Sequence, residues 1–309
     1  MIKQPLISIA LCTYNGELYI EEQITSILNQ SYHNFELIVS DDCSIDNTLE
    51  IIIAFAKQDS RIKLLKNEKN IGYISNFEKA VKNCNGEFIF LSDQDDIWLP
   101  EKVFEVINSF KIDTKLVFHD SLFINSYGES LNKKTSNRFC LDQNVQPFAF
   151  LLFNGIPGHA LAFRKELISS IIPFPKIIHH DCWISFVASC KGEIIYLPKV
   201  LVGYRQHCSS ETDLLKLKTN KHTKISAQVR NQKLIDIIDR FLEIKENKFF
   251  KALARFRSLL EKRNYQFFSF SLFLFIVKYH QEIFSFKRKK GLKRLVYTLP
   301  FIWGLKLKN

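Results

Sequence analysis

Short apolar runs alternate with amphipathic segments through the first hundred residues. Strands are predicted at residues 6–11, 35–40, 62–65 and 88–91, and helices between them at residues 19–30, 49–56 and 76–84. The strand runs are apolar throughout rather than alternating, which is typical of strands buried on both faces. The repeated order strand–helix–strand therefore predicts an α/β fold, with a mostly parallel sheet covered by helices on both faces.

Polar clusters follow three of these strands. They are TYNG at residues 13–16, Ser40-Asp41-Asp42, and DQDD at residues 93–96. Because ligands bind beyond the carboxyl ends of the strands in such sheets, the three clusters predict one pocket. The glycine motifs GxGxxG and GxxxxGK[ST] do not occur in the sequence, which argues against a dinucleotide oxidoreductase and a P-loop nucleotidase.

The second hundred residues alternate less regularly. Further strand and helix pieces are predicted at 115–125 and 160–172, and residues 179–207 read as a loop, a helix, a strand pair and a polar end. Beyond Leu215 the pattern becomes helical and basic. The sequence thus predicts one domain at 1–214, with halves at 1–96 and 97–214, and a helical basic extension at 215–309.

The acidic cluster DQDD has three interpretations. Asp95 or Asp96 could cap a helix that begins near Pro100, although one aspartate suffices for a cap. A calcium loop of the EF-hand type is disfavoured, because the ligand spacing and its closing glutamate are missing. A divalent cation site explains the most features of this cluster. Mg²⁺ or Mn²⁺ would offset the repulsion between the carboxylates, and it would hold a diphosphate without a glycine-rich loop.

The composition indicates the cellular compartment in which the protein folds. Hydrophobic residues make up 46% and charged residues 24%, as in ordinary globular proteins. The 7 cysteines show no paired spacing, which predicts free thiols and a reducing compartment. The apolar start is interrupted by Ser8 and shows no cleavage site, so it is interpreted as a strand rather than an export signal. A cytoplasmic location is expected.

The net charge of +11 is uneven, because residues 215–309 carry 23 Lys and Arg against 6 Asp and Glu. The apolar run at 267–277 is too short for the ~20 residues that span a bilayer. It is either a helix buried against the first domain or a segment at the membrane surface. The mixture of Phe, Leu and Trp with basic residues at 287–294 favours peripheral binding to an anionic membrane, and the aromatic bulk disfavours nucleic acid. A merely solvated basic face is the alternative.

Six ordered motifs carry a family resemblance over roughly residues 5–210. They are ISIALCTYNG, ELIVSDDCSIDNT, NIGYISNFEKA, FLSDQDDIWLPEK, HHDCW and YRQH. Together they resemble the family 2 glycosyltransferases of the GT-A fold, and SDQDDIW, HHDCW and YRQH look most like the bacterial polysaccharide branch that includes many rhamnosyltransferases. The resemblance implies that 1–214 is a GT-A catalytic domain, with 1–96 as its nucleotide-binding half and 97–214 as its acceptor half. It also implies a sugar-nucleotide donor, linked to UDP or dTDP, and a glycan or lipid-linked glycan acceptor.

The resemblance also implies roles for individual residues. The donor nucleotide would be held by the first loop, the next strand end and the acidic cluster, that is by Thr13, Tyr14, Asn15, Glu17, Asp41, Asp42 and Asp93. Arg205 would contact phosphate. Asp93 and Asp95 match the DxD pair, and with His207 they would hold Mn²⁺ or Mg²⁺. Asp181 matches the general base.

These roles predict direct transfer of a sugar with inversion, in which the metal ion stabilises the leaving diphosphate and one carboxylate removes the acceptor proton. Other interpretations remain open. Asp181 could cap the helix that begins near Trp183, and His207 could be a surface histidine at a strand end. The alternatives for the whole chain are a sugar nucleotidyltransferase and a non-catalytic scaffold of a polysaccharide assembly complex.

Overall fold

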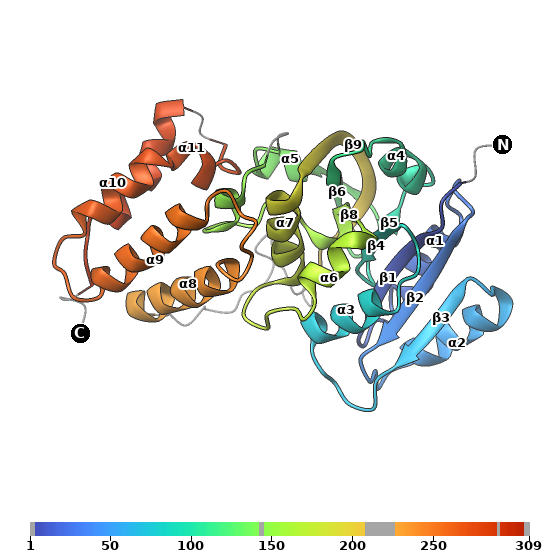
Figure 1. The fold of residues 1–309 in the computed structure, drawn as a ribbon. Coiled ribbons are helices and arrows are strands. Elements are labelled where there is room, and N and C mark those ends of the chain that lie inside the picture. Colours follow the sequence, from blue (N-terminus) through green and yellow to red (C-terminus); the bar gives the residue numbers. More distant parts are fainter. Residues whose placement is uncertain (1–3, 142–144, 208–225, 289–290, 306–309) are drawn as a thin grey trace.

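A nine-stranded sheet forms the centre of the protein (Figure 1). The computed structural model describes residues 4–141, 145–207, 226–288 and 291–305, and the side chains of 291 and 292 are not described. The spatial order of the strands is β3-β2-β1-β4-β8-β6-β9-β5, and β7 pairs with β6. The strands are β1 (Ile7–Thr13), β2 (Phe35–Asp41), β3 (Ile62–Lys66), β4 (Phe88–Ser92), β5 (Ile97–Trp98), β6 (Thr114–Ile124), β7 (Ser130–Lys134), β8 (Leu161–Arg164) and β9 (Glu193–Arg205).

Helices cover both faces of this sheet and form a separate group after it. The α-helices are α1 (Ile20–Leu28), α2 (Thr48–Gln58), α3 (Tyr73–Lys82), α4 (Lys102–Asn108), α5 (Thr135–Arg138), α6 (Ile168–Ile171), α7 (His180–Lys191), α8 (Ala227–Phe241), α9 (Phe250–Arg263), α10 (Phe270–Lys278) and α11 (His280–Ile283). Short 3₁₀ helices lie at Pro147–Phe150 (η1), Gly158–Ala160 (η2), Lys165–Leu167 (η3), Gly291–Tyr297 (η4) and Leu299–Phe301 (η5). The α/β class and the C-terminal helices expected from the sequence are confirmed.

The sheet is parallel only in its first half. Strands β1, β2, β3 and β4 pair in parallel, as the sequence predicts. Beyond β4 the sheet is mixed, because β8 lies antiparallel between β4 and β6, and β5 and β7 are antiparallel to their neighbours. The strand pair predicted within residues 193–205 is one strand, β9, parallel to β6. The register shifts between His119 and Asp120, opposite Pro198, which has no N–H to give to the ladder.

The two faces of the sheet belong to different hydrophobic cores. In β1, Ile7, Ile9 and Leu11 point into a core covered by α1, α2 and α4. Ala10 and Cys12 point into the other core, covered by α3 and α7. This alternation is the two-residue period of a strand, and it explains why β1 is apolar at almost every position.

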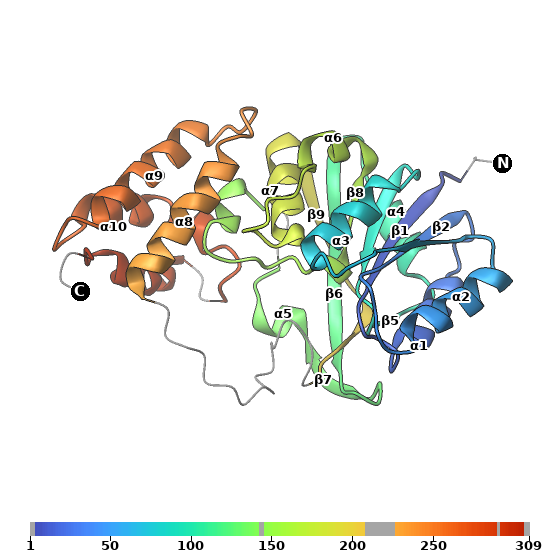
Figure 2. The same cartoon turned by 90° about the horizontal axis from the view of Figure 1, so that it is seen from below.

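The second core continues into the C-terminal helices (Figure 2). Phe186 of α7 stacks on Phe241 of α8 with ring centroids 3.6 Å apart, and Phe148 of η1 packs against Phe249 and Phe275. A large share of the 28 phenylalanines serves this seam between the sheet and helices α8–α11. The expected boundary near residue 214 lies outside the described residues. Within the described part, no helix has the length and apolar character needed to cross a membrane.

Candidate active site

The carboxyl ends of β1, β2 and β4 lie side by side, so the three polar clusters predicted from the sequence meet at one edge. Thr13 pairs with Asp41 in the β1–β2 register, and Leu11 pairs with Ser92 of β4. The Thr13 hydroxyl donates to Asp41 Oδ1 at 3.0 Å, and both side chains are buried. Asp41 also accepts hydrogen bonds from the Ser44 amide and hydroxyl. This carboxylate therefore fixes the start of the loop after β2.

The loop after β1 is tied to both neighbouring loops. The Tyr14 amide donates to Gln94 Oε1 at 2.8 Å, while the 45% exposed Tyr14 ring faces solvent. Asn15 has a positive φ of 49°, and its side chain accepts from the Ile45 amide. Glu17 accepts from the backbone and side chain of Asn47, at the amino end of α2. Glu17 and Asn15 thus shape the loop in addition to their expected role with the donor.

Asp42 faces away from the first loop. Its carboxylate accepts hydrogen bonds from Asn67 Nδ2, the Ile71 amide and the Gly72 amide, at 2.8, 2.8 and 2.9 Å. Asp42 is 2% exposed. It orders the segment that leads into α3, and a direct contact with the nucleotide stays a prediction.

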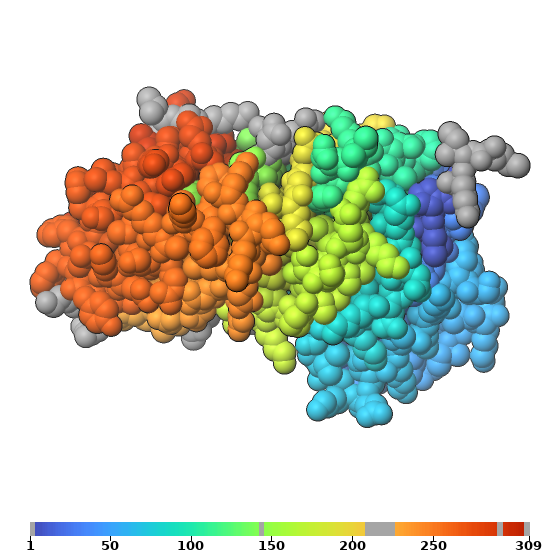
Figure 3. Space-filling view, viewed as in Figure 1, coloured from blue at the N-terminus to red at the C-terminus, as the bar shows by residue number. Residues whose placement is uncertain are grey.

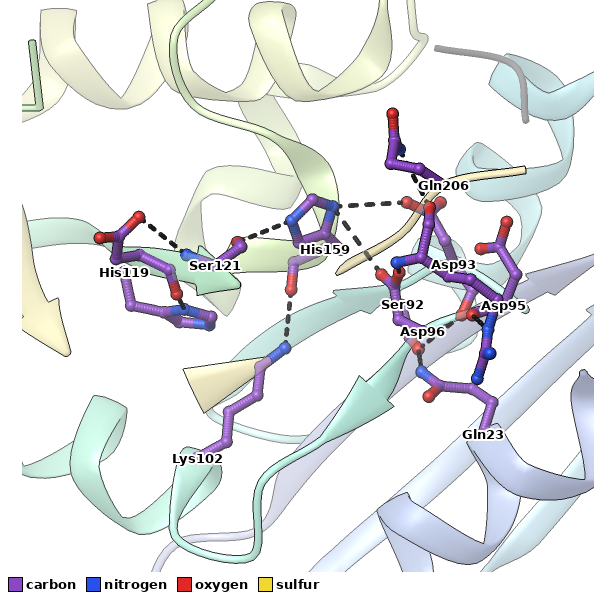
Figure 4. Close-up of polar contacts among 12 residues, drawn as sticks. Gln23, Ser92, Asp93, Asp95, Asp96, Lys102, His119, Ser121, His159 and Gln206 are labelled. Atoms are coloured by element: carbon purple, nitrogen blue, oxygen red, sulfur yellow. Dashed lines mark hydrogen bonds and ion pairs between the residues drawn. The ribbon is translucent and has the colours of Figure 1, made fainter. Parts of the chain in front are cut away.

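The acidic loop after β4 meets a histidine from η2 (Figure 4). His159 Nδ1 lies 3.9 Å from Asp93 Oδ2 and 3.8 Å from Asp96 Oδ2, and ligand atoms of the three residues lie within 4.8 Å of one another. Asp96 Oδ2 is buried and has no hydrogen-bond partner among the described residues. An orphaned buried carboxylate oxygen beside an imidazole nitrogen fits the ligand set of a divalent cation.

Asp95 points to a different partner. Its Oδ2 lies 2.8 Å from Nε2 of His207, the residue that follows Gln206 at the end of β9. The structure therefore brings together Asp95 and His207, which the sequence predicts as metal ligands. Asp93 lies instead with Asp96 and His159. Five acidic and imidazole groups thus form two clusters, and the carboxylate of Asp181 is near enough to influence Asp93.

Arg205 holds the acidic loop from within the protein. Its amide donates to Asp96 Oδ1 at 3.0 Å and its Nε donates to the Asp95 carbonyl at 2.7 Å. The rest of the guanidinium contacts the carbonyls of Asn125 and Ser126 and the carboxylate of Glu22, and the residue is 1% exposed. The contact with phosphate expected from the sequence would require the guanidinium to leave these acceptors. In this structure Arg205 positions the DQDD loop.

Several side chains at this edge of the sheet have strongly shifted pKa values. Burial and the neighbouring charges of Asp95 and Asp181 raise the pKa of Asp93 to about 7. Burial, followed by Asp95 and Asp93, raises the pKa of Asp96 well above its usual value. Burial also lowers the pKa of His159, and the nearby Lys102 lowers it further. A neutral imidazole is the form that binds metals.

Lys102 is the buried cation of this group. Its ammonium donates to the His159 carbonyl at 2.6 Å and lies 3.5 Å from the centre of the Trp98 ring. His159 in turn is held on its other nitrogen by Ser121 at 2.9 Å. The imidazole is thereby fixed with Nδ1 toward the carboxylates.

Asp181 lies in the first turn of α7. Burial raises its pKa, although hydrogen bonds from the Cys182 and Gly158 amides and from the Asn154 side chain, together with the charge of His179, lower it in part. The N-cap of α7 is His179, which makes no side-chain capping bond, and its Nδ1 lies 2.8 Å from the Tyr73 hydroxyl. Asp181 is close enough to Asp93 for its charge to raise the pKa of that residue.

The helix-cap interpretation of the acidic loop is wrong. The N-cap of α4 is Glu101, with no side-chain capping bond, and Asp95 and Asp96 make other contacts. Asp96 and His159 were not expected from the sequence as metal ligands, and Lys102 was not expected at the site. Asp96 could have been found as the third acid of its cluster. His159 has no such signal, because η2 reaches the site only through its packing against β4 and β6.

A sequence pattern described as Glycosyl transferase family 2 matches residues 8–172. The chain belongs to this family. The matched segment includes the first loop and the DQDD loop, and it ends before Asp181 and His207. The family assignment replaces the nucleotidyltransferase alternative.

Two curated relatives act in glycan transfer according to their names. The Escherichia coli UDP-Glc:alpha-D-GlcNAc-diphosphoundecaprenol beta-1,3-glucosyltransferase WfgD is 30% identical over 224 residues, which cover 72% of this chain and 83% of WfgD. The Shigella flexneri dTDP-rhamnosyl transferase RfbG is 29% identical over 214 residues, which cover 64% of this chain and 71% of RfbG. The chain is therefore a glycosyltransferase whose relatives include a rhamnosyltransferase.

Two solved structures share the fold. S. aureus TarS 1–349 in complex with UDP-GlcNAc superposes with a TM-score of 0.55 and 17% identity, covering 91% of this chain and 82% of that one. The mannosyltransferase PcManGT from Pyrobaculum calidifontis, in complex with GDP-Man and Mn²⁺, gives a TM-score of 0.53 and 15% identity, covering 97% and 80%. These likenesses support the GT-A fold.

Proposed function

We propose that this protein is a metal-dependent, inverting glycosyltransferase that moves one sugar from a nucleoside-diphosphate donor to a hydroxyl of a glycan in bacterial surface polysaccharide synthesis. The observation that supports the proposal is the gathering of acidic and imidazole groups beyond the carboxyl end of β4, where Asp95 contacts His207 and Asp93 lies with Asp96 and His159. UDP- and dTDP-linked sugars, rhamnose among them, are the proposed donors, since WfgD and RfbG are named for such donors.

The donor would lie along the carboxyl ends of β1 and β2. Thr13, Tyr14, Asn15 and Glu17 come from the first loop, and the Tyr14 ring, which is exposed, would stack on the base. Asp41 would contact the nucleoside beside them. Asp42 and Arg205 would act by holding the neighbouring loops in place, since both are buried in contacts with the protein.

A divalent cation is the proposed cofactor, with Mn²⁺ and Mg²⁺ both suited to oxygen-rich sites. Asp93, Asp95 and His207 are the proposed ligands, and Asp96 and His159 offer a further pair of ligand atoms beside Asp93. The ion, when bound, stabilises the negative charge that develops on the departing diphosphate.

Asp181 is the proposed general base. Its carboxylate would take the proton of the acceptor hydroxyl while that oxygen attacks the anomeric carbon from the side opposite the diphosphate. Attack from that side inverts the anomeric centre, and the single base suffices because no covalent intermediate forms. The acceptor is proposed to be lipid-linked, with the enzyme at the cytoplasmic membrane face and its basic C-terminal region toward the lipid.

The test is a transfer assay with a panel of UDP-, dTDP- and GDP-sugars, with Mn²⁺, Mg²⁺ or chelator. We expect product only with metal, and NMR of the product should show the anomeric configuration opposite to that of the donor. Retained configuration would reject the single-base mechanism. Absence of both transfer and donor hydrolysis across the panel would favour the scaffold alternative.

A further inference from the structure

Apolar side chains gather on the outer end of the C-terminal helices, at the turn between α9 and α10. We call this the aromatic end surface. Its members and their exposed fractions are Phe267 46%, Phe268 62%, Phe270 62%, Leu274 50%, Leu299 51% and Trp303 56%. Figures 1 and 3 place these helices at the end of the molecule farthest from β3 and α2. So many exposed aromatic groups in one place mark an interaction surface rather than scattered surface residues.

The chain holds this surface in a fixed form. The Ser269 amide donates to the Ile302 carbonyl at 2.7 Å, and the Gly304 amide donates to the Phe267 carbonyl at 2.9 Å. The Phe268 and Trp303 rings lie 5.2 Å apart, centre to centre. Arg263 donates to the carbonyls of Pro300 and Trp303. The C-terminal segment is thus clamped against the α9–α10 turn with its rings outward.

Helix α10 explains why some apolar groups of the run are exposed and others are not. Leu272, Phe275 and Ile276 face the core, whereas Phe270 and Leu274, four residues apart, share the outer face. Lys278 continues that face by one more turn and is exposed. The apolar run, which the sequence predicts to be either buried against the first domain or at a membrane surface, is therefore buried on one side and exposed on the other.

Helix α9, which leads into the aromatic end surface, carries basic groups. On α9, Lys251, Arg255 and Lys262 share one exposed face, and none of them forms an ion pair with any described acidic residue. Residues 215–309 as a whole carry 23 Lys and Arg against 6 Asp and Glu. This charge opposes docking of a second copy of the same region and favours an anionic partner.

Two members of the basic cluster singled out in the sequence, Lys287 and Arg294, contact other parts of the protein. Arg294 is 8% exposed and donates to the carbonyls of Gln281 and Ser285. Lys287 lies 3.7 Å from the Phe153 ring centre, and Phe284 and Phe286 are buried. These residues join the C-terminal helices to the sheet, so the exposed apolar groups that could enter a lipid surface lie elsewhere.

We propose that the aromatic end surface docks the enzyme on an anionic phospholipid bilayer, with Phe268, Phe270 and Trp303 entering the headgroup region and the α9 cations contacting lipid phosphates. The inference rests on the proposed function in one respect, because a lipid-linked acceptor would be met at that bilayer. Exposed aromatic rings on the α9–α10 turn and exposed cations along α9 suit such an interface, which offers both apolar and anionic groups.

Tryptophan fluorescence gives a direct test on the full chain. Trp98 and Trp183 are 2% and 3% exposed, so a blue shift on adding phosphatidylglycerol vesicles reports Trp303. We expect the shift with phosphatidylglycerol vesicles and little with phosphatidylcholine vesicles. Trp303→Phe should abolish the shift while vesicle co-sedimentation persists. No shift and no co-sedimentation with anionic vesicles would overturn the proposal.

Variants locate the contact. The triple variant Phe268→Ser/Phe270→Ser/Trp303→Ser should lower the vesicle partition coefficient at least ~10-fold, because each ring loses its transfer from water. Ile112→Ser, at a 90% exposed position between α4 and β6, is the matched control and should change nothing. Equal binding by the triple variant, or concentration-dependent dimers through this surface without vesicle binding, would reject the proposal.

Transfer assays separate this inference from the proposed function. The triple variant should retain sugar transfer to a short water-soluble acceptor and lose most transfer to an acceptor embedded in vesicles. Vesicle binding without any transfer would count against the proposed function and leave the docking surface standing. Transfer to both acceptors by a wild-type protein that does not bind vesicles would support the proposed function and reject the docking surface.

Discussion

The catalytic edge of the sheet and the outer end of the C-terminal helices depart from ordinary protein surfaces in opposite ways. At the catalytic edge, charged groups are buried: Asp96, Lys102 and Arg205 are each 1% exposed or less. At the outer end, aromatic groups are exposed, with Phe268 and Phe270 both at 62%. Each departure costs folding free energy, since buried charges lose hydration and exposed rings gain no burial. The comparison teaches that both departures need an explanation beyond stability, and our two proposals supply one: a polar ligand at the catalytic edge and a lipid surface at the outer end.

The largest expected effect falls on catalysis. Asp181→Asn should lower the rate of sugar transfer by ~10²–10⁴-fold, because the amide cannot take the acceptor proton. Donor binding, measured by calorimetry with metal present, should be unchanged, and thermal stability should not fall, since a buried carboxylate is replaced by a neutral group. A rate near that of the wild type would place the base elsewhere and leave the family assignment intact.

The next largest effect is expected on stability, from a substitution in the seam between the sheet and helices α8–α11. Phe241→Ala removes a fully buried ring that stacks on Phe186, and we expect a loss of roughly 3–5 kcal/mol in the free energy of unfolding. Phe104→Ala, at a 50% exposed position on α4, is the matched control. Urea unfolding followed by circular dichroism should show one transition in both variants. Two separated transitions would mean that helices α8–α11 fold independently of the sheet.

Buried charge can also be tested away from the active site, at Glu36 in β2. Burial alone would raise its pKa, but hydrogen bonds from Lys63, Ser8 and Asn85 outweigh it and lower the pKa to about 2. Because the pKa is lower in the folded state, this group stabilises the protein above about pH 4.5, and the contribution disappears as the pH falls toward 2. The shift corresponds to about 3 kcal/mol as an upper value.

The check for Glu36 is the unfolding free energy measured across that pH range. Glu36→Gln should be less stable than the wild type at pH 7, and the difference should shrink steadily below about pH 4.5. Glu101→Gln, at an exposed position, should follow the wild-type curve. A constant difference between Glu36→Gln and the wild type at all pH values would show that charge is not the cause.

The smallest expected effect on stability comes from a substitution in the aromatic end surface. Phe270→Ser should change the unfolding free energy by no more than ~0.5 kcal/mol, as for ordinary surface substitutions, because the 62% exposed ring contributes little burial. Denaturant titration measures it. A loss comparable to that of Phe241→Ala would show that the ring is part of the core, and the aromatic end surface would then need another explanation.

The first half of the fold follows from the sequence because its signals are local. Apolar runs such as Ile7–Leu11 and Phe88–Leu91 are long enough to mark buried parallel strands, and their polar ends mark the pocket. The antiparallel insertion of β8 between β4 and β6 was not predictable, because strand order depends on packing rather than on any single run. The same holds for β9, which was predicted as a strand pair and is one strand that continues through Pro198 with a shift of register.

The site shows the same division. Asp95 and His207 could be placed together through motifs at the ends of two strands, and the structure puts them 2.8 Å apart. Asp93 was assigned to the same set, yet its imidazole neighbour is His159. Arg205 was expected to face phosphate and instead holds the acidic loop. The sequence shows which chemical groups follow each strand. It does not show which of these groups contact each other, because that depends on side-chain directions set by the folded loops.

The Phe186–Phe241 stack has a practical consequence for anyone who wishes to shorten this protein. Helix α7 carries Asp181 in its first turn, and the same helix presents Trp183 and Phe186 to the rings of α8. A version trimmed back to the sheet would leave those rings in water and loosen the helix that aims the carboxylate. The minimal working enzyme therefore extends well past the last strand.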